Sequence, residues 1–480
     1  MAQFYLGQAY FTGNGVVQDQ SEAVKWFRKA AVQGIADAQY SLGGCLFEGR
    51  GVEQDYKEAV KWFRKAAQQG FAPAQFYLGN CYHDGDGVVQ DFKEAAKWFR
   101  KAADQGLAKA QFNLANSYLN GEGVAKTYKE AVKWYRRAAE QGHLEAICNL
   151  GLCYIKGYGV SRNVEQASEL FRIAALQGIA EAQYYLGLYY EIEKEGEKDY
   201  EAAVKWYLIA AQQGHVDAQF SLGCCYFEGK GVEQNDDEAM KWWREAAEQG
   251  HVKAQINLAS ILDKNKGDAQ DYSETSRWWR EAAEQGVPVA QFNLGNCYYF
   301  GKGVDQNYGE AVKWLLLSAQ QGFKEAQNTL GGCYYDGLGV DQDYQEAVKW
   351  FRKAAEQGFD LAQFNLANCY YTGHGVPQNI EDAVPWWRKA AEQGHVKAQV
   401  NLGQVYSNGA GVEQNYEEAV KWYLKAAQQG DSAAQYYLGF CYHEGEGVDK
   451  DPVEALKWFQ KSAEQGDTDA IEILKSLEEK

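Results

Sequence analysis

Paired glycines are the first feature of this sequence that suggests chemistry. In the stretch FEGRGVEQDY, Gly49 and Gly51 precede an expected helix, and a G-x-G loop before a helix can bind a phosphate through free backbone N–H groups. The pair occurs eleven times, with middle residues as different as Arg50 and Asp86. Because an acidic residue would repel a phosphate, we interpret the glycines as the turn that ends one helix and lets the chain pass closely into the next.

Ten cysteines raise the question of disulfides or a zinc site. Eight of them share one repeat position on the apolar side of an expected helix: Cys45, Cys81, Cys153, Cys225, Cys297, Cys333, Cys369 and Cys441. Stacked helices lie about 8–10 Å apart, too far for an undistorted disulfide, and no Cys-x-x-Cys spacing suits zinc. We therefore expect reduced core thiols and no metal site. Free thiols favour a reducing compartment, so we expect a cytoplasmic protein, unless a signal peptide was removed.

Histidine and serine offer a general base and a nucleophile. Four of the seven histidines recur at one junction between helices: His143, His215, His251 and His395. Repetition at a position that also accepts Ile35 favours a packing role over catalysis. No Ser-x-x-Lys and no G-x-S-x-G sequence occurs, so the serine-hydrolase signatures are missing. We predict no catalytic residue and no cofactor.

The elements that carry these residues follow a strict repeat. The dipeptide Gln-Gly recurs every 36 residues, from Gly34 to Gly466, without insertion or deletion. A fixed period of about 20–50 residues indicates a solenoid, in which each unit contacts mainly its neighbours.

Each repeat is expected to form two helices, as in Ile35–Gly70. The first spans about residues 36–48, and its predicted apolar side is Ala38, Gln39, Leu42, Gly43, Cys45 and Leu46. The second spans about residues 56–69, with Ala59, Val60, Trp62, Phe63, Ala66 and Ala67 inward. Asp55 is the expected N-cap, and every copy has Asp, Asn or Thr there, including Thr127. Positions are named below after this repeat.

Comparison among the repeats shows which positions are constrained. The Leu42 position is always Leu, and the Trp62 position is Trp in all copies but the one with Leu170. The Gly43 position is Gly or Ala. Because alanine is accepted there, that position requires a small side chain and not a positive φ, so we expect two helices to approach closely.

The pattern A-x-x-x-L-G-x-x-Y-x-x-G-x-G-V-x-x-(D/N)-x-x-x-A-x-x-W-x-x-x-A-A-x-x-G resembles the Sel1-like repeat family, a relative of the tetratricopeptide repeats. One matching copy consists of Ala74, Leu78, Gly79, Tyr82, Gly85, Gly87, Val88, Asp91, Ala95, Trp98, Ala102, Ala103 and Gly106. The resemblance implies an all-α fold: a right-handed α/α superhelical solenoid of about thirteen 36-residue helix-turn-helix repeats plus a C-terminal capping helix. It also implies a concave groove lined mostly by the first helices, and a role as an adaptor or scaffold in protein complexes.

Composition and charge limit the partners. The 480 residues carry a net charge of −18, which argues against a general nucleic-acid binder, and no apolar run is long enough for a transmembrane helix. We expect a solenoid at residues 1–466, its first repeat slightly truncated, and a capping helix at 467–480. No polar cap is evident at the N-terminus, so self-association through that end is expected if no further sequence covers it.

The useful variation lies on the arc of the first helix away from the core, at the Asp37, Ser41, Gly44 and Glu48 positions. Asparagines one turn apart can hydrogen-bond an extended peptide, and tyrosines are favoured at interfaces. The predicted partner-binding residues are Tyr77, Asn80, Asn113, Asn116, Asn149, Tyr185, Asn257, Asn293, Asn296, Asn365, Asn368, Asn401 and Tyr437. Acidic residues at the Glu48 position, Asp84, Glu228, Asp336 and Glu444, indicate a basic or polar peptide. A solvated polar face is the competing interpretation.

Three functions follow from these patterns and from the resemblance. The first is a non-catalytic scaffold that binds protein segments in its groove. The second is a structural solenoid that assembles into oligomers or filaments. The third is a hydrolase, because some cysteine-rich relatives have been discussed as penicillin-binding. Two irregular segments, residues 191–200 and 263–272, lose glycines of the repeat. They mark a local change in superhelix curvature, a partner contact or sequence drift.

Overall fold

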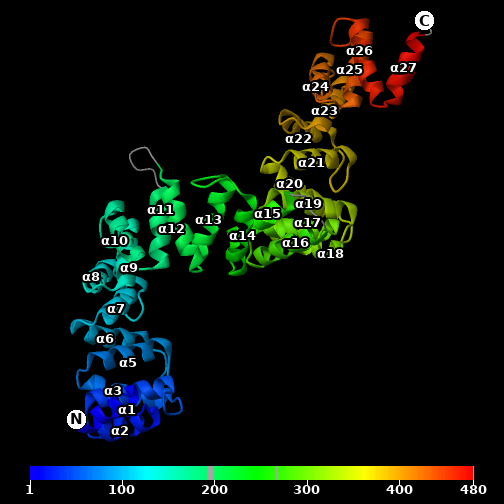
Figure 1. Cartoon of the computed structure of the whole chain (residues 1–480). Coiled ribbons are helices and arrows are strands. Elements are labelled where there is room, and N and C mark those ends of the chain that lie inside the picture. The colour runs from blue at the N-terminus through cyan, green and yellow to red at the C-terminus, as the bar shows by residue number, and fades with distance from the viewer. Residues whose placement is uncertain (192–197, 265–268, 479–480) are drawn as a thin grey trace. The chain divides into compact units, whose positions relative to one another are not determined.

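The computed structural model describes residues 1–191, 198–264 and 269–478. This part of the chain contains 27 helices and no strand (Figure 1). The first helices of the repeats are α1 (Ala2–Thr12), α3 (Ala36–Glu48), α5 (Ala72–Asp84), α7 (Ala108–Asn120), α9 (Leu144–Lys156), α11 (Ala180–Glu191), α13 (Val216–Glu228), α15 (Val252–Lys264), α17 (Pro288–Phe300), α19 (Lys324–Asp336), α21 (Asp360–Thr372), α23 (Val396–Asn408) and α25 (Ser432–Glu444).

The second helices complete the hairpins. They are α2 (Gln20–Val32), α4 (Tyr56–Gln68), α6 (Phe92–Asp104), α8 (Tyr128–Ala139), α10 (Val164–Leu176), α12 (Tyr200–Gln212), α14 (Asp236–Glu248), α16 (Ala269–Glu284), α18 (Tyr308–Gln320), α20 (Tyr344–Glu356), α22 (Ile380–Glu392), α24 (Tyr416–Gln428) and α26 (Pro452–Glu464). A last helix, α27 (Thr468–Glu478), packs against α26. The chain divides into two compact units, Met1–Ala246 and Ala247–Lys480, and each is described by itself.

Each hairpin packs tightly within itself and against the next hairpin in its unit, as the element order in Figure 1 shows. In α3 and α4 the buried residues are the predicted apolar sets, with Leu42 and Phe63 fully buried. The expected helix bounds are confirmed to within one residue. Amphipathic helices thus bury one face in a core that runs from repeat to repeat.

A small residue at the Gly43 position lets the two helices of a hairpin meet. A Cβ atom on Gly43 would lie 2.7 Å from ring carbons of Phe63, whereas one on the neighbouring Gly44 would meet nothing within 4 Å. Gly43 lies inside α3 and does not have a positive φ. The predicted need for smallness at this position is therefore confirmed.

The paired glycines form the turn between the two helices. Gly49 has φ 71°, and its N–H donates to the Cys45 carbonyl at the end of α3. Gly51 has φ 70°, and a Cβ there would lie 2.3 Å from the Gln20 carbonyl oxygen of the preceding repeat. The first glycine therefore ends a helix, and the second permits close contact between repeats. The interpretation of this loop as a turn is confirmed.

Most second helices begin at the predicted cap. Asp55 Oδ1, for example, accepts the Glu58 backbone N–H at 2.9 Å. Two copies differ from the prediction. The Thr127 hydroxyl donates to the Ala125 carbonyl and makes no cap bond, and Asp271 falls inside α16, which begins at Ala269. A local turn thus competes with the cap in one repeat, and an earlier helix start removes it in the other.

Buried glutamines join successive repeats in a ladder that the sequence analysis did not predict. Gln39 Nε2 donates to the Ala31 carbonyl at 3.1 Å, and Gln69 Nε2 donates to Gln39 Oε1 at 2.7 Å. Equivalent bonds recur along both units. Ile147 replaces the buried glutamine in one repeat. A carbonyl at the end of each second helix gains a donor in this way.

Of the irregular segments predicted at 191–200 and 263–272, residues 192–197 and 265–268 lie outside the described residues. In the described part of the chain, no helix is long and apolar enough to cross a membrane.

Candidate binding surface on the first helices

The thirteen predicted partner-binding residues all lie on first helices and are all half-buried. They occupy two repeat positions only, those of Ser41 and Gly44. We call the row of Asp37, Ser41, Gly44 and Glu48 positions the first-helix face. The structure brings the Gly44 position of one repeat together with the Ser41 position of the next, 33 residues further along the chain.

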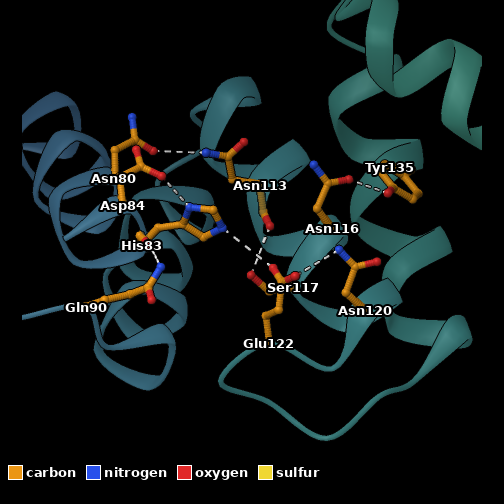
Figure 2. A network of polar contacts seen from close by, with 10 residues as sticks. All are labelled: Asn80, His83, Asp84, Gln90, Asn113, Asn116, Ser117, Asn120, Glu122 and Tyr135. Carbon is orange, nitrogen blue, oxygen red and sulfur yellow. Dashed lines mark hydrogen bonds and ion pairs between the residues drawn. The ribbon is translucent and has the colours of Figure 1, made fainter. Parts of the chain in front are cut away.

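In the unit Met1–Ala246, this pairing is seen between two asparagines (Figure 2). Asn113 Nδ2 donates to Asn80 Oδ1 at 3.1 Å. Beside it, His83 Nδ1 lies 2.6 Å from Asp84 Oδ1, and His83 Nε2 lies 3.6 Å from Glu122 Oε2. Successive first helices are therefore linked by a polar network along this part of the face.

Asn116 does not form a free pair with Asn113 on its own helix. The Tyr135 hydroxyl donates to Asn116 Oδ1 at 2.5 Å, and Asn149 Nδ2 donates to the same hydroxyl at 3.3 Å. Burial raises the pKa of Tyr135 well above its usual range, so the hydroxyl stays protonated and can donate. Tyr135 on α8 thus hydrogen-bonds one asparagine of α7 and one of α9.

In the unit Ala247–Lys480, some of the predicted asparagine side chains form hydrogen bonds to other side chains and others do not. Asn365 Nδ2 donates to Asn328 Oδ1 at 3.0 Å, and Trp387 Nε1 donates to Asn368 Oδ1 at 3.0 Å. Four predicted residues make no side-chain hydrogen bond to another residue that the structure describes: Asn257, Asn293, Asn296 and Asn401. These four amides keep their full capacity for an external ligand.

The three predicted tyrosines share one arrangement. Tyr77 stacks on Phe63 with ring centroids 5.4 Å apart, and Tyr437 stacks on Tyr423 at 5.2 Å. Tyr185 stacks in the same way on Phe171. Each tyrosine ring therefore packs over the aromatic residue that lies against the small residue at the Gly43 position of the preceding repeat.

Two hollows open between successive first helices, one in each unit. The first, of about 280 Å³, is lined by Phe11, Phe27, Tyr40 and Phe47 among others. The second, of about 410 Å³, is lined by residues including Tyr423, Tyr436, Tyr437, Phe440 and Glu446. They lie at equivalent places in the repeat, because Phe27 and Tyr423 both occupy the Phe63 position and form the aromatic part of the lining.

The network of Figure 2 fills the equivalent place between α5 and α7. Asn80 and Asn113 there occupy the positions that Gln404 and Tyr437 occupy at the second hollow. The same structural site is therefore aromatic and open in some repeats and polar in others.

The acidic residues predicted to surround the groove are all exposed. Glu228 forms an ion pair with Lys230, and Asp84 contacts His83. Glu444 lies 3.6 Å from His443. Lys230 offsets negative charge in one repeat, so the charge of the first-helix face varies from repeat to repeat.

The cysteines and histidines have structural roles. All ten cysteines are unpaired, and all but Cys224 are buried.

His143 and His395 accept the backbone N–H of Ala146 and Ala398 through Nδ1, at 3.3 and 3.2 Å, so each caps a first helix. Their rings also stack on aromatic residues of the preceding repeat. The predicted packing role of these histidines is confirmed, whereas their role as helix caps was not predicted. The described residues contain no group of three or more His, Cys, Asp or Glu able to hold a metal ion.

Sequence analysis missed the contacts that join one repeat to the next. A signal for the glutamine ladder was present, because Gln39 and Gln69 recur in almost every copy, 30 residues apart. The Gly44 and Ser41 positions carry no such signal: Gly44 is followed by Tyr77 in the next repeat, but Gly332 is followed by Asn365.

The fold and the repeat define a class: an all-helical solenoid of helix-pair repeats related to the tetratricopeptide type. The Sel1 repeat family model matches thirteen times in succession and covers residues 1–467. The chain belongs to the Sel1 repeat family.

The chain is similar to c5321, a protective antigen present in uropathogenic Escherichia coli strains that displays an SLR fold. The two sequences are 36% identical, and the crystal structure of c5321 matches this structure with a TM-score of 0.70. The match covers 95% of this chain and 97% of that one. A Sel1 repeat protein from Oxalobacter formigenes is 34% identical over 51% of this chain and 97% of that one, with a TM-score of 0.47. The comparison with curated proteins gave no match. Proteins with Sel1 repeats are commonly protein-interaction scaffolds, and the matches indicate no catalytic family.

Proposed function

We propose that this protein is a non-catalytic scaffold that binds extended segments of other proteins on its first-helix face. The observation that carries the proposal is the recurrence of an aromatic-lined hollow at the same repeat position in both units. A hollow of this kind can take a side chain of a bound segment, while neighbouring amides bind its backbone.

The bonded asparagine pair supports backbone recognition. Asn113 donates one N–H to Asn80, which leaves the Asn80 amide nitrogen and the Asn113 amide oxygen without a side-chain partner. In Figure 2 the two amides lie end to end, joined by this bond. One free donor and one free acceptor are the groups that can pair with the C=O and N–H of an extended peptide.

The test is a peptide-display selection on the full chain, followed by fluorescence anisotropy with the selected synthetic peptides. Gly44 lines the first hollow, and a Cβ there would meet nothing within 4 Å. Asn408 is exposed and lines the second hollow. Gly44→Phe and Asn408→Phe should therefore fold normally and block one hollow each. Lys61→Phe, at an exposed position on α4, is the matched control.

We expect each selected peptide to lose at least about tenfold in affinity, about 1.4 kcal/mol, with one of these two variants. The control should leave its affinity unchanged. Peptides that ignore both Gly44→Phe and Asn408→Phe, or that respond only to Lys61→Phe, would show that binding takes place elsewhere and would contradict the proposal.

A further inference from the structure

The residue at the Arg50 position decides the charge at the mouth of each hollow. In the unit Met1–Ala246, Arg50 lines the hollow, and its Nε lies 2.6 Å from Glu48. In the unit Ala247–Lys480, the same position holds Glu446, which lines the second hollow. Equivalent hollows therefore carry different charges.

Glu446 has no ion-pair partner in the part of the chain that the structure describes. Its side chain is half-buried, and no lysine or arginine lines the hollow. Glu122, at the same position in another repeat, instead approaches His83 and accepts from Asn120. A half-buried carboxylate without a cation is a charge that a ligand can compensate.

The rest of the lining of this hollow is aromatic. Tyr437 stacks on Tyr423 with an angle of 25° between the rings, and Tyr436 meets Tyr437 edge to face. Gln404 Nε2 donates to the Tyr437 hydroxyl at 2.9 Å and fixes that ring. Burial, together with nearby groups that include Glu446, raises the pKa of Tyr423. The Tyr423 hydroxyl therefore stays protonated, and the rings are preorganised with the carboxylate beside them.

Tyrosine rings next to an uncompensated carboxylate match one kind of side chain best. An arginine guanidinium is planar, stacks on aromatic faces and pairs with a carboxylate through two parallel N–H bonds. A lysine ammonium is a strongly hydrated point charge and loses more on entering the hollow. An apolar or acidic side chain would leave Glu446 uncompensated.

Building on the proposed function, we infer that the hollow between α23 and α25 binds an arginine side chain of the partner segment, with Glu446 as its counter-ion. The hollow of about 410 Å³ has room for the whole side chain. The net charge of −18 also favours the approach of a basic segment. This inference names the partner chemistry of one hollow only. The first hollow, where Arg50 and Glu48 are already paired, has no such requirement.

The test uses the same display selection, run on the full wild-type chain and on the full Glu446→Gln variant. Glu122→Gln is the matched control, because it makes the same change at the same repeat position elsewhere. A selected peptide is then synthesised with arginine, with lysine, and with the neutral analogue citrulline at the enriched position. Thermal unfolding of each variant confirms that it is folded.

We expect arginine to be enriched at one peptide position on the wild type and on Glu122→Gln, and not on Glu446→Gln. Citrulline should weaken binding to the wild type at least about tenfold, lysine by less, and the ratio between arginine and citrulline should fall to about one on Glu446→Gln. No arginine enrichment, or an unchanged ratio on Glu446→Gln, would overturn the inference.

The two proposals fail in different ways. Peptides that respond to Asn408→Phe but do not need arginine would contradict only the role of Glu446. If no selected peptide responds to Gly44→Phe or Asn408→Phe, the proposed function fails.

Discussion

The side-chain nitrogen of Gln404 donates to the Tyr437 hydroxyl at 2.9 Å and joins the first helices of two successive repeats. Asn113 and Asn80 make the same connection, also across 33 residues. Because each bond is formed between the Gly44 position of one repeat and the Ser41 position of the next, the surface that varies most in sequence is also braced by its own side chains. A ligand there meets groups whose geometry is already set, which lowers the entropy cost of binding.

Two adjacent glycines give opposite predictions for stability. Gly43→Ala places a Cβ 2.7 Å from the Phe63 ring, and we expect it to lower the free energy of unfolding by about 1–3 kcal/mol through overpacking. Gly44→Ala meets no atom within 4 Å and should raise stability by up to about 1 kcal/mol through helix propensity. Urea unfolding followed by circular dichroism measures both. Equal effects of the two substitutions would contradict the close approach at Gly43.

The glutamine ladder should contribute to the coupling between repeats. Gln327 Nε2 donates to the Ala319 carbonyl at 3.0 Å, and its Oε1 accepts from Gln357 at 2.7 Å. Gln327→Leu removes both hydrogen bonds, but the Ala319 carbonyl keeps the Gly322 N–H and the exposed Gln357 keeps the Lys353 carbonyl. We therefore expect a loss of about 1–2 kcal/mol. Gln345→Leu, at an exposed position in the same repeat, is the control.

Hydrogen exchange localises this effect. Amides of α18 and α19, which the Gln327 bond connects, should lose more protection than those of distant repeats. A uniform change, or none, would mean that the ladder does not couple neighbours.

The parts of this structure that the sequence predicted are those set within one repeat. The 3.6-residue spacing of Ala38, Leu42 and Cys45 predicts the buried side of α3, and the turn glycines and Asp55 mark its boundaries with α4. Contacts across repeats depend on the register between hairpins, which no single repeat encodes. For that reason the ladder and the pairing of Asn80 with Asn113 appeared only in the structure. The histidine caps are local, but histidine is not among the usual N-cap residues and was not expected to cap a helix.

Histidine caps make stability depend on pH. Burial lowers the pKa of His143 and His395 from the usual 6.5, with the charges of Glu145 and Asp360 opposing the shift. The cap also requires a neutral Nδ1. Since the unfolded chain then binds more protons, stability is complete above about pH 6.5 and is lost as the pH falls below it.

His395→Asp tests this dependence, because Asp431 at the same repeat position caps its helix through the Ala434 N–H at 2.9 Å. We expect a smaller decrease in melting temperature between about pH 7.5 and 5.5 for the variant than for the wild type. An identical pH profile would show that the histidine cap does not contribute.

Burial should also protect the thiols. It raises the pKa of Cys45 to about 11 and of Cys369 to about 12. Because the thiolate is the reactive form, we expect slow alkylation of the native protein at about pH 8 and rapid labelling of all ten cysteines after denaturation. Mass spectrometry counts the adducts. Fast native labelling of several cysteines would contradict the buried, unpaired arrangement.

The central claim is that partner segments bind to the first helices and not to the second. The most direct measurement places a photo-reactive benzoylphenylalanine at Asn408, which lines the second hollow, and in a separate variant at Lys421, exposed on α24 of the same repeat. Ser41, which lines the first hollow, and Lys61 on α4 form the same comparison in the other unit. Irradiation with a display-selected peptide should give crosslinks from Asn408 or Ser41 and none from Lys421 or Lys61. Crosslinks from the two lysine positions alone would contradict the account.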